Sequence, residues 1–157
     1  MKGAAVVDLI IVITLITTFF IIALFAKTTW DDISSEDTVF AEQSHIKSYV
    51  DQNVSMIGSL GVILFGGAIA ALAIMSFLQQ SHPVFLVISV IVLIVSIPLM
   101  VIQSNIAMEV ATSTPALEAA ADSYPMATEM MANLLIWGVV GAIIILAALY
   151  SKFGGGR

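Results

Sequence analysis

Residues 83–108 have the sequence PVFLVISVIVLIVSIPLMVIQSNIAM, and none of them is charged. An α-helix needs roughly 20 apolar residues to cross the hydrocarbon core of a bilayer, so this run is long enough to span one. It is too long for a strand and lacks the two-residue alternation of a membrane barrel strand. The run therefore predicts a transmembrane helix.

Three further apolar runs of similar length lie on either side of it. They cover residues 4–26, 54–77 and 132–150. Because a bilayer offers backbone groups no hydrogen-bond partners, each run is expected to be helical. We predict an all-α integral membrane protein, a single domain of residues 1–157 with four transmembrane helices in an up-down bundle and helical extensions outside the membrane.

The composition supports a membrane protein and excludes other classes. The chain of 157 residues is 60% hydrophobic and 10% charged, whereas soluble domains are about 25% charged. It contains no cysteine, which rules out disulfides and thiolate metal sites. Its net charge of -6 argues against binding to nucleic acid, which requires a basic surface.

The first run is interpreted as a span and not as a signal peptide, because it is too long and Leu24-Phe25-Ala26 fits a cleavage site poorly. Four spans put both termini on one side of the membrane. That side carries Lys2, Lys152 and Arg157, against Lys27 and Lys47 on the other, which predicts cytoplasmic N- and C-termini. Every carboxylate except Asp8 then lies in one of two outer loops, residues 27–53 and 109–131.

The first outer loop carries signals of helical extension. The sequence Ser34-Ser35-Glu36-Asp37 predicts a helix start with Ser34 as the cap. An apolar stripe then leads directly into the second span, formed by Val39, Ile46, Val50, Val54 and Ile57.

Prolines in the second half of the chain predict helix starts and one helix kink. Thr114-Pro115 predicts a capped helix start, and Ser123-Tyr124-Pro125 predicts another that leads into the fourth span. Pro98 is expected to kink the third span, since it removes one backbone hydrogen bond. The glycine-rich tail, residues 153–157, is expected to be flexible.

The search for catalytic or metal chemistry finds little. The two histidines, His45 and His82, are predicted to lie on opposite sides of the membrane, so they cannot share a metal or a haem. Gly58-Ser59-Leu60-Gly61 is not a nucleophile elbow. The acidic stretch 31–37 offers oxygen ligands for calcium but lacks the EF-hand glycine and spacing, so a solvated surface is favoured. We predict no enzyme activity, no cofactor and no metal.

Two groups of polar residues are candidates for transport elements. Asp8 is the only ionisable residue within an apolar run, but it lies near the start of the first span, where Lys152 is expected at the same depth, so an ion pair between them is favoured. The second group would lie near the outer ends of the spans and could form a vestibule for a small solute. It comprises Asn53, Ser55, Ser59, Gln103, Ser104, Asn105, Glu129 and Asn133. Ordinary polar helix ends are favoured, because the inner halves of the spans carry almost no polar residue.

The most informative pattern is the spacing of small residues in the second and fourth spans. Glycine and alanine four residues apart allow helix backbones to approach closely, within the chain or with a neighbour. The predicted packing interface comprises Gly66, Gly67, Ala70, Ala71, Gly138, Gly141 and Ala142.

These observations favour a structural or assembly subunit of a larger membrane complex or of a virion membrane. Its expected partners are the lipid bilayer and other subunits or identical copies. The expected docking surface comprises Asp31, Asp32, Glu36, Asp37, Val39, Ile46 and Val50. The alternatives are a small channel or carrier for a cation or small polar solute, and a receptor-like protein that binds through its acidic loops.

Overall fold

A computed structural model describes residues 5–36, 44–78 and 83–151, and within these ranges the chain forms helices joined by short turns, without any strand. The long helices are α1 (Ala5–Glu36), α3 (Ser44–Leu78) and α4 (Pro83–Ala111). Three shorter helices follow, α5 (Pro115–Asp122), α6 (Pro125–Ala132) and α7 (Leu134–Tyr150). The predicted all-α class is confirmed.

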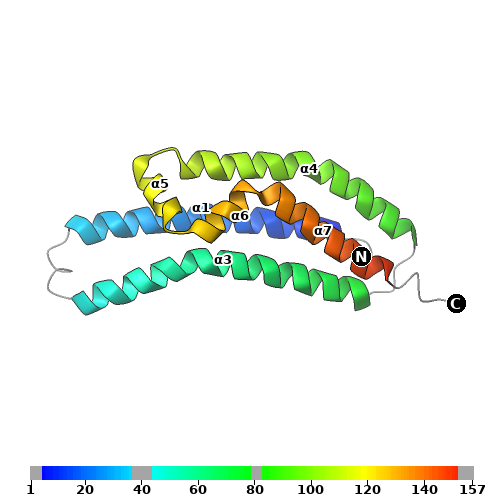
Figure 1. Ribbon diagram of the computed structural model, residues 1–157, viewed down its shortest axis with the longest axis horizontal. Helices are drawn as coiled ribbons and strands as arrows, with labels where there is room; N and C mark the ends of the chain where they lie inside the picture. The colour runs from blue at the N-terminus through cyan, green and yellow to red at the C-terminus, as the bar shows by residue number, and fades with distance from the viewer. Residues whose placement is uncertain (1–4, 37–43, 79–82, 152–157) are drawn as a thin grey trace.

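The long helices lie side by side as an elongated bundle, with α7 alongside them (Figure 1). Three helices, α1, α3 and α4, are long and apolar enough to cross a membrane. Helices α6 and α7 pass the same criterion only as a pair, and the chain bends by 79° between them. The molecule thus has the character of a helical membrane protein with three spans, or four if the bent pair counts as one.

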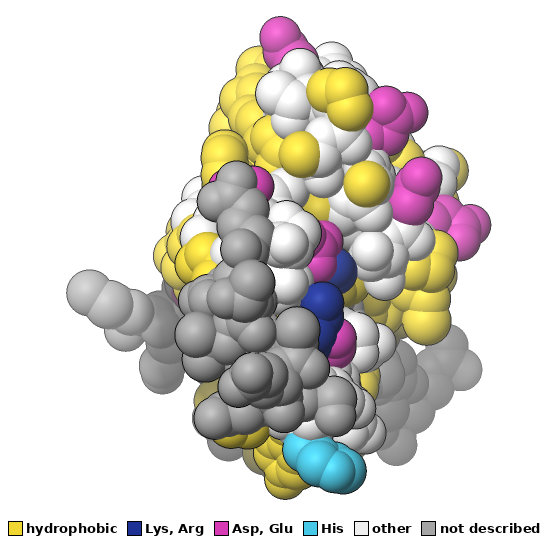
Figure 2. Space-filling view, turned by 90° about the vertical axis from the view of Figure 1, so that its left-hand side faces the viewer, with side chains coloured by type: hydrophobic (Ala, Val, Ile, Leu, Met, Phe, Trp, Pro, Cys, Tyr) yellow, Lys and Arg dark blue, Asp and Glu magenta, His cyan; other side chains and the backbone are white. Residues whose placement is uncertain are grey.

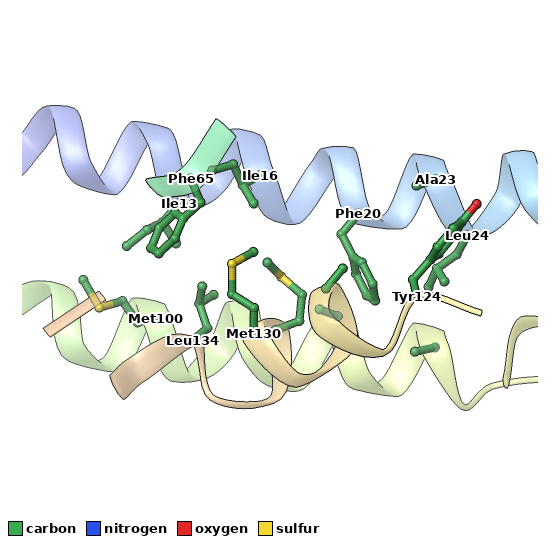
Figure 3. Packing of buried hydrophobic residues seen from close by; sticks show 14 of the residues in the cluster. Ile13, Ile16, Phe20, Ala23, Leu24, Phe65, Met100, Tyr124, Met130 and Leu134 are labelled. Atoms are coloured by element: carbon green, nitrogen blue, oxygen red, sulfur yellow. The ribbon is translucent and has the colours of Figure 1, made fainter. Parts of the chain in front are cut away.

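The core is organised around α1. In its most apolar 18-residue window, 39% of α1 is buried, against 17% for α3 and for α4. The buried residues Leu9, Ile13, Ile16, Phe20 and Leu24 recur every three or four positions, so they line one face of the helix. Figure 3 shows several of them pointing toward side chains of α4, α6 and α7.

The segment between α4 and α7 packs within the bundle. Helix α5 contacts α1 and α4, and α6 contacts α3 and α4. Their inward side chains are fully or nearly fully buried, namely Leu117, Ala120, Ala121, Tyr124, Ala127, Met130 and Met131. This predicted outer loop is therefore part of the core, because its alanines and methionines fill the space that the short α7 leaves between the long helices.

The helix starts predicted from prolines are confirmed, with one difference. Thr114 caps α5, where its side chain accepts a hydrogen bond from the Leu117 N–H, and Pro115 is the first helical residue. Helix α6 begins at Pro125, but its cap residue is Tyr124, without a side-chain cap bond. Ser123 instead donates its hydroxyl to the Ala119 carbonyl.

The helix start predicted at Ser34 is wrong. Helix α1 continues through this position and ends at Glu36. Ser34 and Ser35 donate their hydroxyls to the carbonyls of Asp31 and Asp32, an arrangement that a helix interior tolerates. Contacts between the extensions of α1 and α3, described below, favour this continued helix over a local cap.

The predicted extension of the second span is confirmed from Ser44 onward. Helix α3 continues without a break through Asn53, whose side-chain amide donates to the Tyr49 carbonyl at 2.7 Å. Val54 and Ile57 are partly buried, whereas Val39 and the tail 153–157 lie outside the described residues. Pro98 lies inside α4, which remains one helix across it.

Candidate functional site

The predicted packing residues form two sets that face opposite ways. Gly138, Gly141 and Ala142 of α7 are buried inside the bundle. A Cβ atom added to Gly138 would lie 2.6 Å from the sulfur of Met100, and one added to Gly141 would lie 2.8 Å from Cδ1 of Ile69. These glycines therefore allow α7 to pack closely against its neighbours within the chain.

The four small residues of α3 face outward. Gly66, Gly67, Ala70 and Ala71 are exposed, and a Cβ atom added to either glycine would meet no atom within 4 Å. The two glycines therefore give α3 no close helix contact within the described residues, and a contact with a neighbouring molecule stays a prediction.

A groove of about 490 Å³ lies between α3 and the bent pair α6–α7. Its volume falls within the range of about 300–1,000 Å³ that is common for small-molecule sites. Gly66 and Ala70 form part of its α3 wall, whereas Gly67 and Ala71 lie outside it. The lining residues are Val62, Phe65, Gly66, Ile69, Ala70, Met126, Glu129, Met130, Trp137, Val140 and Ile144.

Glu129 is the one charged residue in the groove lining. It lies on α6, which the bend turns away from the direction of α7. Within the described residues, its carboxylate forms no hydrogen bond or ion pair, whereas its backbone carbonyl accepts bonds from the side-chain amide and the backbone N–H of Asn133. Trp137, which is 47% exposed, lines the same groove from the first turn of α7. The sequence placed Glu129 among polar helix ends and did not indicate that it lines one groove with Trp137, because the bend cannot be read from residue spacing.

Four of the remaining polar residues of the hypothetical vestibule form hydrogen bonds elsewhere in the bundle. Gln103 donates to the Thr14 hydroxyl at 2.7 Å, joining α4 to α1, and Ser104 donates to the Met131 carbonyl at 2.8 Å. Asn53 and Ser55 bond within their own helix. These four residues lie inside α3 and α4 and not at helix ends, and Gln103 and Ser104 join α4 to α1 and α6.

Beyond the apolar core, the extensions of α1 and α3 remain attached to each other. The Trp30 indole N–H donates to the Asp51 carboxylate at 2.7 Å, and Lys47 donates to the Ser34 carbonyl at 3.3 Å. Asp31 forms an ion pair with Lys27 on the same helix. These bonds make the two extensions one helical unit.

Acidic side chains gather at this end of the molecule (Figure 2). Of the predicted docking residues, Asp31, Asp32 and Ile46 are exposed and Val50 is partly buried. Asp37, Val39 and the side chain of Glu36 lie outside the described residues. Asp31 and Asp32 also border an open cleft of about 530 Å³ between α1 and α5.

The Tyr124 side chain connects this end to the core. It is 2% exposed, and its hydroxyl donates to the Val54 carbonyl at 2.8 Å. Burial raises the pKa of Tyr124 to about 12, and the negative charge of Asp31 adds to the effect. The Tyr124 phenol is therefore protonated and neutral at physiological pH.

The predicted ion pair between Asp8 and Lys152 and the predicted separation of the two histidines stay predictions. Asp8 is partly buried and has no ion-pair partner within the described residues, while Lys152 lies outside them, as does His82. His45 is exposed on α3. No group of three or more histidine, aspartate or glutamate side chains in the described part of the chain could hold a metal ion.

Comparisons of the chain with family models, curated proteins and solved structures found no significant match.

Proposed function

We propose that this protein is a non-catalytic structural or assembly subunit that packs against other subunits, or copies of itself, in a membrane complex or virion membrane. The proposal takes the bent pair α6–α7 as a fourth span in an up-down bundle. It places the N- and C-termini on the cytoplasmic side, in keeping with the lysines and arginine near them, and the acidic extensions outside.

The observation that carries the proposal is the outward face of α3. Gly67 and Ala71 are exposed, lie four residues apart, and leave the helix surface flat enough for another backbone to approach. The same spacing in α7 is occupied by close contacts within the chain. Small residues gain nothing by facing lipid, whereas in helix–helix contacts they increase dispersion contact.

The lengths of α1 and α3 support a second contact surface. They contain 32 and 35 residues, so at 1.5 Å per residue they are about 48 and 52 Å long. A hydrocarbon core of about 30 Å leaves roughly 20 Å of each outside it. Joined by the Trp30–Asp51 and Lys47–Ser34 hydrogen bonds, the extensions offer a preformed acidic surface to a partner.

The experiment compares small-to-large variants by measuring particle mass in lipid nanodiscs and after mild detergent extraction. Gly67→Leu and Ala71→Leu are expected to release a monomer from an assembly that the wild-type protein forms. The matched control is Ala147→Leu, the same kind of change at an exposed small residue of α7.

All three variants are expected to retain the helical content and melting temperature of the wild type. A wild-type protein that is strictly monomeric and recovers no other subunit from its native membrane would refute the proposal. So would an assembly that persists in both α3 variants.

A further inference from the structure

We propose that the groove between α3 and α6–α7 binds an amphiphilic cation, a molecule with an apolar body and a single ammonium-like charge, through Glu129 and Trp137. This inference concerns ligand binding and does not depend on the proposed assembly role.

The depth of the groove bears on how the charge of the Glu129 carboxylate is neutralised. The α3 residues that line it, Val62 to Ala70, lie 8 to 16 residues from the inner end of α3 at Leu78, or about 12–24 Å along the helix axis. In a hydrocarbon core of about 30 Å, this places the groove below the interface. Glu129 itself is exposed at the α6 side of the groove, and beside these apolar walls its negative charge is stabilised by a partner that neutralises it.

The chain does not provide that partner within its described residues. Lys27 is paired with Asp31, and Lys47 binds the Ser34 carbonyl, both on the extensions of α1 and α3. Within the same described residues, a second copy of the chain would bring the same two engaged lysines. The described residues therefore place no positive charge beside Glu129. A bound cation can supply that charge.

The other lining residues define the rest of the ligand. Apart from Glu129 the walls are apolar, formed by aliphatic side chains, methionines, Phe65 and Trp137. The indole of Trp137 attracts cations over its face, especially where water is excluded. One carboxylate and one exposed indole in an apolar groove complement a lipophilic cation, and they disfavour an anion of the same shape.

The test uses two ions of nearly identical shape and opposite charge, tetraphenylphosphonium and tetraphenylborate. The protein carries Trp30→Phe, so that Trp137 is its remaining tryptophan, and is placed in nanodiscs of neutral lipid. Tetraphenylphosphonium is expected to change the Trp137 fluorescence in a saturable way, whereas tetraphenylborate is not.

Glu129→Gln is expected to weaken tetraphenylphosphonium binding at least tenfold, and Gly66→Leu, which fills the groove, is expected to abolish it. The matched control is Glu118→Gln, which neutralises an exposed carboxylate on α5 outside the groove and is expected to leave binding unchanged. Gly67→Leu, the assembly variant, is also expected to bind normally, so loss of assembly and loss of ligand binding can be told apart.

Three results would overturn the inference. These are equal affinity in Glu129→Gln, equal saturable binding of the two ions, and an absence of saturable tetraphenylphosphonium binding by the folded protein.

Discussion

The aromatic ring of Tyr124 packs directly on the backbone of Gly58. A Cβ atom added to this glycine would lie 2.3 Å from Cδ1 of Tyr124 and 2.9 Å from its Cβ. Because the tyrosine hydroxyl also binds the Val54 carbonyl, the ring is fixed at both ends. This contact attaches the α5–α6 turn to α3. Tyr124 and Val54 are 70 residues apart in the sequence.

Gly58→Ala is expected to destabilise the fold by about 1–3 kcal/mol, the usual cost of forcing an extra methyl group into a packed site. The displaced atoms include the Cβ of Tyr124, which cannot move without its backbone. Reversible unfolding in detergent micelles measures the change. Gly67→Ala is the control and should retain or slightly gain stability, since its methyl group meets no atom and alanine favours helix. Equal stability of the two variants would contradict the tight contact.

Alkaline pH should destabilise the protein through Tyr124. Its pKa is raised from 10.0 to about 12 in the folded state, so folding favours the neutral phenol. This contribution is complete below about pH 10 and is lost as the pH rises through about 12, by up to roughly 2–3 kcal/mol.

The measurement is the free energy of unfolding across this range, together with the ultraviolet absorbance of tyrosinate. Tyr124→Phe should remove the late-titrating tyrosine and flatten the alkaline loss. An unchanged pH profile in that variant would assign the loss to other groups.

The hydrogen bond from Ser104 to the Met131 carbonyl should contribute modestly. Ser104→Ala is expected to cost about 0.6 kcal/mol, the average for such bonds inside membranes. Ser113→Ala, which removes an exposed hydroxyl bonded within its own turn, should cost less. Unfolding in the same micelles compares the two, and a larger loss at Ser113 would argue against the α4–α6 bond.

The Trp30–Asp51 bond should determine how firmly the extensions of α1 and α3 stay together. Asp51→Ala is expected to cost about 0.5–1.5 kcal/mol and to speed proteolysis of both extensions. Asp51→Asn keeps an acceptor oxygen and should behave nearly as the wild type. In a Trp137→Phe background, Trp30 emission reports the environment directly. Identical emission in all three proteins would show that the bond is absent in solution.

The sequence predicted the long helices well, because an uninterrupted apolar run has few structural alternatives in lipid. Proline positions likewise predicted where α5 and α6 begin. The Ser34 start was wrong because serine followed by acidic residues is compatible with either end of a helix. Contacts with α3, distant in sequence, decide between them.

The groove could not be predicted for a related reason. Glu129 and Trp137 are eight residues apart, and the 79° bend at Asn133 determines which α3 residues face them. Residue spacing along a helix says nothing about the direction of a break. In the same way, the equal spacing of small residues in α3 and α7 could not reveal that one set is covered and the other exposed.

The break before α7 also has a consequence for the surrounding lipid. Helix α7 has 17 residues and is only about 26 Å long, several ångströms less than an average hydrocarbon core, whereas α4, which packs against it, is 29 residues long. In the proposed topology, acyl chains beside α7 compress to match it, at a fraction of a kcal/mol per ångström. In the proposed topology the protein therefore presents walls of unequal height to the bilayer, with the short wall at α7 and the taller ones at α1, α3 and α4.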